Sequence, residues 1–243
     1  MLNKIFLVFF NYFLNLVDLL NKLRIKNFFK KNLQYSSLVI IDIGAHKGET
    51  INFFIRNFNI SKIYAFEANK ELEKILLKKK EINPEKIELL NYGVGDEEKF
   101  IPLNVIIDTA SSTFNEIDTS SKYYIRKNKI LSLFSKRRSF IDKIQQTKII
   151  KLSTFINEKK IEKIDVLKID TEGFEYKVLK GIQKIDFKKI RFIYLEHHFD
   201  TMIKKNYKFS DINNLLKKNN FKQRYKIKMS FRKSFEYIYE KKD

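Results

Sequence analysis

The sequence contains no cysteine and no tryptophan, and only two prolines and six glycines among its 243 residues. Without cysteine, disulfide bonds and thiolate chemistry are excluded, and nothing in the composition indicates an oxidising compartment. Because glycine is so scarce, each one is expected where the chain needs a positive φ angle or a close backbone approach. The six glycines fall in four short stretches, and these are Gly44–Gly48, Gly93–Gly95, Gly173 and Gly181.

Arginine is also scarce, since only eight of the 49 basic residues are arginine although the formal net charge is +20. Such a charge can indicate nucleic-acid binding, but arginine is the better reader of base edges and phosphates. Lysine, asparagine, isoleucine and phenylalanine are all abundant, which indicates a compositional bias spread over the whole surface. We therefore expect a globular protein without a nucleic-acid partner.

Residues 1–35 differ from the rest of the chain because they are apolar apart from one polar stripe and a following basic patch. Asn11, Asn15, Asp18 and Lys22 are spaced four, three and four residues apart, which puts them on one face of a helix. A membrane-spanning helix would bury Asp18, and no small-residue cleavage site follows, so neither a clean span nor a signal peptide fits. We expect an amphipathic helix on an anionic membrane surface, as a peripheral contact of a cytoplasmic protein. The alternative is a helix packed on the domain or on a second subunit.

The stretch Leu38–Thr50, L-V-I-I-D-I-G-A-H-K-G-E-T, has the pattern around which the remaining chain is organised. A continuous apolar run that ends near Asp42 is typical of a strand buried on both faces of a parallel sheet. Gly44 and Gly48 enclose a tight turn, and apolar residues then continue at helical spacing. A strand, a glycine turn and a helix start together predict a nucleotide-like ligand at the carboxyl end of the first strand.

Strands and helices alternate through residues 36–243, which predicts one α/β domain with right-handed crossovers and a mostly parallel sheet. We expect a doubly wound sheet of seven strands. Residues 97–147 are expected to form an irregular insertion with a hairpin and a short helix. The predicted strands are Leu38–Ile43, Lys62–Glu67, Ile87–Val94, Ile164–Ile169, Arg191–Leu195, Lys222–Met229 and Phe235–Glu240.

In this arrangement the polar residues at the strand ends lie along one edge of the sheet. Glu67 ends the second strand, 25 residues after Asp42, which is close to the usual spacing between a glycine loop and a ribose-binding acid. A dinucleotide pattern requires small residues where this chain has His46 and Glu49, because a pyrophosphate must come close to the backbone. S-adenosylmethionine has no phosphate and carries an amine and a sulfonium, so an acid-lined loop fits it better.

The motifs D-I-G-A-H-K-G-E-T, Y-A-F-E, N-Y-G-V-G-D and I-D-V-L-K-I-D-T-E-G-F-E-Y-K-V-L-K-G resemble those of the FkbM-type S-adenosylmethionine-dependent methyltransferases. The resemblance covers about Ser37–Glu196, and members typically carry asparagine where this chain has His46. It implies the class I methyltransferase fold, which is Rossmann-like, with S-adenosyl-L-methionine as the cofactor. The cofactor-binding residues expected on this basis are Asp42, Gly44, Ala45, His46, Gly48, Glu67, Asp96 and Asp170.

The resemblance also implies O-methylation of a sugar, a glycan or a related metabolite. A sugar hydroxyl is a poor nucleophile, so a base beside it is expected. His197 and His198 follow the fifth core strand and are the candidates for this base, because histidine titrates near neutral pH. Glu172 and Asp170 are the alternatives, or they would orient the acceptor. A metal site made of these acids and a histidine is a further alternative, but we expect no metal.

Two functions of other classes remain open on the sequence alone. One is an NAD(P)-dependent oxidoreductase, which calorimetry with both cofactors distinguishes from a methyltransferase. The other is a membrane-surface nucleotide-binding module in which the N-terminal helix binds the membrane and the sheet is a scaffold. An RNA methyltransferase ranks lower, because no Asn-Pro-Pro type motif and no added RNA-binding domain is found.

Overall fold

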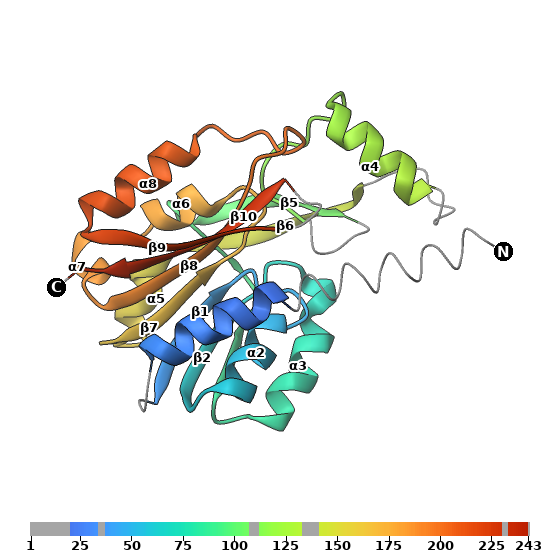
Figure 1. The fold of residues 1–243 in the computed structure, drawn as a ribbon. Coiled ribbons are helices and arrows are strands. Elements are labelled where there is room, and N and C mark those ends of the chain that lie inside the picture. The colour runs from blue at the N-terminus through green and yellow to red at the C-terminus, as the bar shows by residue number, and fades with distance from the viewer. Residues whose placement is uncertain (1–19, 34–36, 107–111, 133–140, 230–232, 243) are drawn as a thin grey trace.

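The computed structural model describes residues 20–33, 37–106, 112–132, 141–229 and 233–242, and a seven-stranded sheet forms its centre (Figure 1). The spatial order of the strands is β3-β2-β1-β7-β8-β10-β9. The strands are β1 (Leu38–Ile43), β2 (Ile60–Phe66), β3 (Ile87–Leu90), β7 (Ile164–Ile169), β8 (Ile190–His198), β9 (Phe221–Lys228) and β10 (Ser234–Lys241).

The sheet is mostly parallel, as the sequence predicts. β1 pairs in parallel with β2 and with β7, and parallel pairing continues outward to β3 and to β8. Only β10 runs antiparallel to both of its neighbours. The chain moves outward from β1 to β3 and later returns beside β1 with β7, so the order of the strands reverses there. Ligands of open α/β sheets bind at such a reversal, outside the carboxyl ends of the strands.

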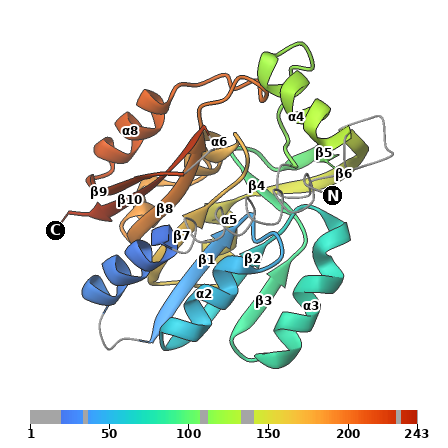
Figure 2. The same cartoon turned by 45° about the vertical axis from the view of Figure 1, so that its right-hand side comes forward.

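Helices cover both faces of the sheet, which confirms the doubly wound prediction (Figures 1 and 2). Along β1, Ile40 packs in the core on one face and Ile41 in the core on the other, and both are fully buried. This is why the strand is a continuous apolar run and not an alternating one. The helices are 20–32, α2 (Glu49–Asn57), the short η1 (Lys70–Leu72), α3 (Glu73–Ile82), α4 (Lys122–Ser132), α5 (Leu152–Glu158), α6 (Glu175–Lys180), α7 (Lys184–Phe187) and α8 (Phe209–Lys218).

The segment expected to be an irregular insertion with a hairpin and a short helix contains both, since β5 and β6 pair antiparallel and α4 lies between them in the sequence. It also forms part of a second sheet. This sheet has three strands in the order β4-β6-β5, and both views show β5, β6 and α4 together at one side of the molecule (Figures 1 and 2). The predicted strand Ile87–Val94 was too long. In the structure, β3 of the central sheet ends at Leu90, and the segment Gly93–Gly95 pairs in the second sheet. The strands are β4 (Gly93–Gly95), β5 (Lys99–Ile106) and β6 (Ile141–Lys151).

The described part of the N-terminal segment packs on the domain, which is the alternative kept open by the sequence. Phe29 is fully buried against the rings of Phe54, Phe192 and Tyr194, and Ile25 lies in the same core. The predicted membrane contact falls largely on residues 1–19, which lie outside the described residues, and it stays a prediction. Among the described residues, no helix is both long enough and apolar enough to cross a membrane.

Candidate active site

The loop after β1 forms the floor of the candidate site because its backbone is tied to two neighbouring strands. The N–H groups of Gly44 and Ala45 both donate to the carbonyl oxygen of Phe66 at the end of β2, at 3.0 and 2.9 Å. Gly44 has a φ of +86°, and a Cβ there would lie 1.8 Å from the carbonyl oxygen of Asp170. Only glycine allows β1 and β7 to approach this closely.

Glu67 lies beside this loop and fixes its shape. Its carboxylate accepts hydrogen bonds from the backbone N–H of His46 at 2.7 Å and of Asn69 at 2.8 Å. Burial raises the pKa of Glu67, although the two backbone N–H donors oppose that rise. His46 has a left-handed φ of +48°, and its Nδ1 lies 3.2 Å from Glu49 Oε1. His46, which stands where FkbM-type sequences typically have asparagine, therefore contacts the first residue of α2.

Asp42 is fully buried at the end of β1, below the glycine loop. Neither of its carboxyl oxygens has a hydrogen-bond partner among the described residues. Burial raises the pKa of Asp42 to about 7, and the nearby Lys168 ammonium opposes the rise. Lys168 is itself 5% exposed, and its Nζ lies 3.2 Å from Asp170 Oδ2. Burial alone would lower the pKa of Lys168, but Asp170 and other carboxylates raise it.

The D-T-E-G turn after β7 is held by the segment that follows β5. Glu172 and Gly173 have φ angles of +49° and +96°. Thr113 Oγ1 donates to the carbonyl oxygen of Glu172 at 2.7 Å, and Asn115 Nδ2 donates to that of Gly173 at 2.6 Å. Both partners come from the segment after β5, so the insertion positions one of the predicted catalytic carboxylates.

The two adjacent histidines point to different sides of β8. The His197 ring is buried and packs against Phe199 and Phe209, with Nδ1 3.5 Å from Glu175 Oε2. Burial opposes the charge of Glu175, but the neighbouring His197 ring and a hydrogen bond donated by Tyr207 Oη lower its pKa to about 2. His197 therefore belongs to a buried polar cluster below the D-T-E-G turn.

His198 lies between two carboxylates. Its Nε2 is 3.5 Å from Glu172 Oε1 and 3.3 Å from Glu196 Oε1. Burial opposes its positive charge, but Glu172 and Glu196 raise the pKa of His198 to about 10. Burial raises the pKa of Glu172 to about 8, although the His198 cation opposes this. At neutral pH, His198 is thus an imidazolium that bridges the two carboxyl groups.

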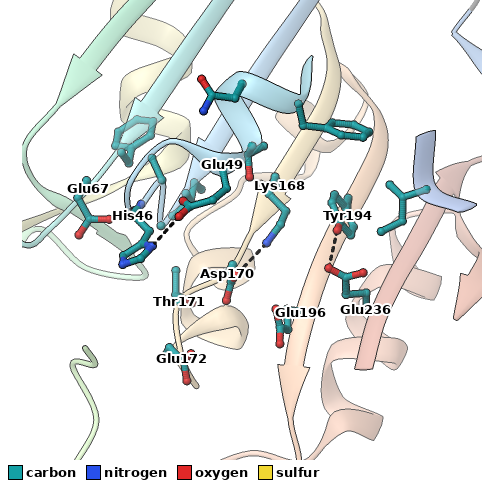
Figure 3. A pocket seen from close by; sticks show the side chains of 18 of the residues that line it. His46, Glu49, Glu67, Lys168, Asp170, Thr171, Glu172, Tyr194, Glu196 and Glu236 are labelled. Atoms are coloured by element: carbon teal, nitrogen blue, oxygen red, sulfur yellow. Dashed lines mark hydrogen bonds and ion pairs between the residues drawn. The ribbon is translucent and has the colours of Figure 1, made fainter. Parts of the chain in front are cut away.

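A cavity of about 790 Å³ opens at the carboxyl ends of β1, β2, β7 and β8 (Figure 3). This volume is in the range of cofactor and substrate sites. Among the described residues, six of the predicted site residues line it, and these are Gly44, Ala45, His46, Glu67, Asp170 and Glu172.

The other predicted site residues are not in this lining. Asp42 lies below the loop, and Gly48 begins α2 with a φ of +79° facing the Lys79 side chain. Asp96 Oδ2 is paired with Lys180 Nζ at 3.1 Å. Its contact with the cofactor stays a prediction.

Sequence reasoning missed part of the lining because these residues lie inside apolar strands. Lys168 interrupts the strand I-D-V-L-K-I, and Glu236 interrupts the strand S-F-E-Y-I-Y. The charged residue within an otherwise apolar strand was the feature of the sequence that could have indicated these lining residues. The helix 20–32 also contributes Lys22 and Lys26 to the wall, which no motif indicated. No group of three or more histidine, aspartate or glutamate side chains in the described part of the chain could hold a metal ion.

Comparison with known proteins gives a family assignment. The model of the methyltransferase FkbM domain matches residues 42–223. No protein of curated function matches the sequence.

Among solved structures, the methyltransferase FkbM from Methylobacillus flagellatus KT is similar to this chain with a TM-score of 0.53 and 13% identity, over 84% of this chain and 44% of that one. Similarity is also found to TrmK of M. capricolum in complex with S-adenosyl-homocysteine, with a TM-score of 0.49 and 14% identity, over 86% of this chain and 64% of that one. The chain therefore spans less than two thirds of either relative.

Proposed function

The chain belongs to the FkbM methyltransferase family, and on this basis we propose that it transfers a methyl group from S-adenosyl-L-methionine to a hydroxyl of a sugar, a glycan or a related metabolite. One observation carries the proposal. The Gly44 loop, Glu67 and the D-T-E-G turn all border one cavity at the point where the strand order reverses. At this one site the Gly44 loop forms the floor, Glu67 provides hydrogen-bond acceptors for a ribose, and the D-T-E-G turn provides two carboxyl groups.

The residues present fit S-adenosylmethionine, the cofactor of this family and fold. Glu67 has a carboxylate that lines the cavity and can accept hydrogen bonds from two ribose hydroxyls. The unpartnered carboxyl of Asp42 puts buried negative charge below the Gly44 loop, which suits a ligand with an ammonium and a sulfonium. Asp170 adds a second carboxyl at the adjacent strand end. When bound, the cofactor supplies an electrophilic methyl group on its sulfonium.

The chain's own residues would align the acceptor, exclude water and accept one proton. We assign the proton to Glu172, because its carboxyl lines the cavity while the His198 ring lies behind it. The His198 imidazolium keeps a positive charge 3.5 Å from Glu172 and stabilises its ionised form. Asp170 would orient the acceptor hydroxyl. This assignment replaces histidine with a carboxylate as the base, one of the two alternatives that the sequence left open.

The experiment for the proposed function follows the methyl group without assuming an acceptor. The purified full chain is incubated with isotope-labelled S-adenosylmethionine and with separated glycan, lipid and metabolite fractions from cells that lack the gene. Mass spectrometry should detect, in one fraction, a product that carries one labelled methyl group on an oxygen. The Glu172→Gln variant should bind S-adenosylhomocysteine normally and give about 10²–10⁴-fold less product. Methylation on nitrogen or on nucleic acid alone would contradict the proposal.

A further inference from the structure

We propose that the acceptor carries a protonated amine, and that Glu236 and Glu196 hold this amine on the side of the cavity away from Glu67 (Figure 3). The inference rests on the proposed function, because it names the chemical class of the molecule that would occupy the acceptor side of the same site. It concerns Glu236, which the proposed methyl transfer does not use, and Glu196, which also contacts His198.

The register of the sheet brings these two carboxyl groups together. β8 and β10 run antiparallel, and Glu236 is paired directly with Glu196. Paired residues of neighbouring strands project from the same face, and two like charges there destabilise the sheet. Both residues line the cavity, and they are only 9% and 6% exposed. Because this arrangement costs stability, a ligand that neutralises it gains a corresponding binding energy.

Glu236 has an oxygen without a partner. Its Oε1 accepts a hydrogen bond from Tyr194 Oη at 2.6 Å, whereas Oε2 has no hydrogen-bond partner among the described residues. A buried carboxyl oxygen without a donor is unfavourable, so a donor supplied by the ligand is expected at Oε2. Glu196 offers a second acceptor, although its Oε1 also lies 3.3 Å from His198 Nε2.

The local charge balance favours an ammonium over a hydroxyl. Four carboxyl groups border this part of the cavity, and two cations lie among them, Lys168 and the His198 imidazolium, so negative charge is in excess. The four carboxyl groups are those of Asp170, Glu172, Glu196 and Glu236. The Lys168 ammonium is 3.2 Å from Asp170, so its charge is already paired. A ligand hydroxyl would satisfy Glu236 Oε2 but would leave the excess negative charge. An ammonium would donate a hydrogen bond to Glu236 Oε2 and would also neutralise part of the excess negative charge.

The other lysine and arginine residues of the lining lie elsewhere. Lys22 and Lys26 are on helix 20–32 and Arg56 is on α2, so they border the cavity from the helices and not from the strand ends. The chain as a whole is strongly basic, with a formal net charge of +20. Attraction of a cationic acceptor therefore depends on the four local carboxyl groups, and loss of one of them should have a measurable effect.

The test measures binding directly, with saturating S-adenosylhomocysteine and EDTA, at pH 7, where the amine of an amino sugar is largely protonated. The probes are small cyclic sugars and alcohols, each in an amine, a hydroxyl and a carboxylate form, including glucosamine, glucose and glucuronate. Ligand-observed NMR and calorimetry should detect amine forms that bind more tightly than their partners. Their dissociation constants should rise at least about tenfold in Glu236→Gln, the loss expected for a charge-assisted bond. Glu240→Gln, on the same strand but paired with Arg224, should leave them unchanged.

Several results would overturn the inference alone. These are hydroxyl or carboxylate forms that bind as well as the amines, amine binding that is equal in wild type and Glu236→Gln, or no amine binding while S-adenosylhomocysteine binds normally. Retained S-adenosylhomocysteine binding shows that a variant is folded, and Glu196→Gln provides a second variant. Failure of the wild-type chain to bind S-adenosylhomocysteine would overturn the proposed function itself, and this inference with it.

Discussion

The chemistry of the site depends on how a few buried carboxyl groups share charge with two cations. Glu172 and Glu196 both contact the His198 ring, and Asp170 pairs with Lys168. A histidine between two carboxylates holds its proton, so it cannot act as a base near neutral pH. A carboxyl with a raised pKa is instead matched to accept a proton from a hydroxyl.

The pH dependence of turnover separates the two candidate bases. Because burial raises the pKa of Glu172 to about 8 and the ionised form is the base, turnover should rise as pH increases through about 8. His198→Asn removes the cation that opposes this shift, so the rise should move to higher pH. The measurement is the pH profile of kcat for wild type and His198→Asn. If His198 were the base, this variant would lose about 10²–10⁴-fold in turnover at every pH.

At the scale of the elements, the helix 20–32 is part of the core. The described residues Ile25, Phe29 and Leu33 are buried on the sheet, whereas Leu20 is 53% exposed. The helix also supplies a wall of the cavity. The described part of the N-terminal segment therefore has a structural role.

Replacement of Phe29 tests this role. Phe29→Ala should lower the free energy of unfolding by about 3–5 kcal/mol, because a fully buried aromatic side chain leaves a cavity. The exposed Leu20→Ala is the control and should change it by less than about 0.5 kcal/mol. Urea unfolding monitored by circular dichroism measures both. Equal stabilities for Phe29→Ala and wild type would show that the helix is not part of the folded core.

The elements also show how far the sequence alone could lead. The parallel strands of the central sheet could be predicted from their apolar runs, and the loop after β1 from its glycine, Gly44, which allows β1 to approach β7. The second sheet could not be predicted, because its pairing of β4 with β6 joins residues far apart in the sequence.

The site was predicted where its residues follow strand ends and missed where they lie inside strands. Glu67, Asp170 and Glu172 end or follow strands, so their edge of the sheet could be deduced. Which way His197 and His198 point depends on the pleat of β8 and on aromatic packing, which no motif encodes. Glu236 enters the cavity only through its register with Glu196.

At the scale of the whole molecule, the buried Asp42 carboxyl lowers the stability of the protein. The ordinary pKa of aspartate is near 3.8, whereas burial raises that of Asp42 to about 7. Between these values the folded chain keeps a proton that the unfolded chain has released. The free energy of unfolding therefore falls as pH rises through this window and stays low above it.

Removal of this buried charge should stabilise the free protein at high pH. Asp42→Asn should raise the free energy of unfolding, relative to wild type, by about 2 kcal/mol more at pH 8 than at pH 5. Chemical denaturation at both pH values measures the difference. The same variant should bind S-adenosylmethionine more weakly, which shows that the charge serves the ligand. A relative stability that does not change with pH would contradict the buried-charge assignment.

The most direct test of the central assignment is calorimetric titration of the full chain with S-adenosylmethionine and with NAD(P). Wild type should bind the former and not the latter. Glu67→Ala should weaken binding by about 1.5–3 kcal/mol, because a charge-assisted hydrogen-bonding group is lost. Glu71→Ala, an exposed acid paired with Lys143 near the same strand, should bind like wild type. Unchanged affinity in Glu67→Ala, or binding of NAD(P) alone, would contradict the account.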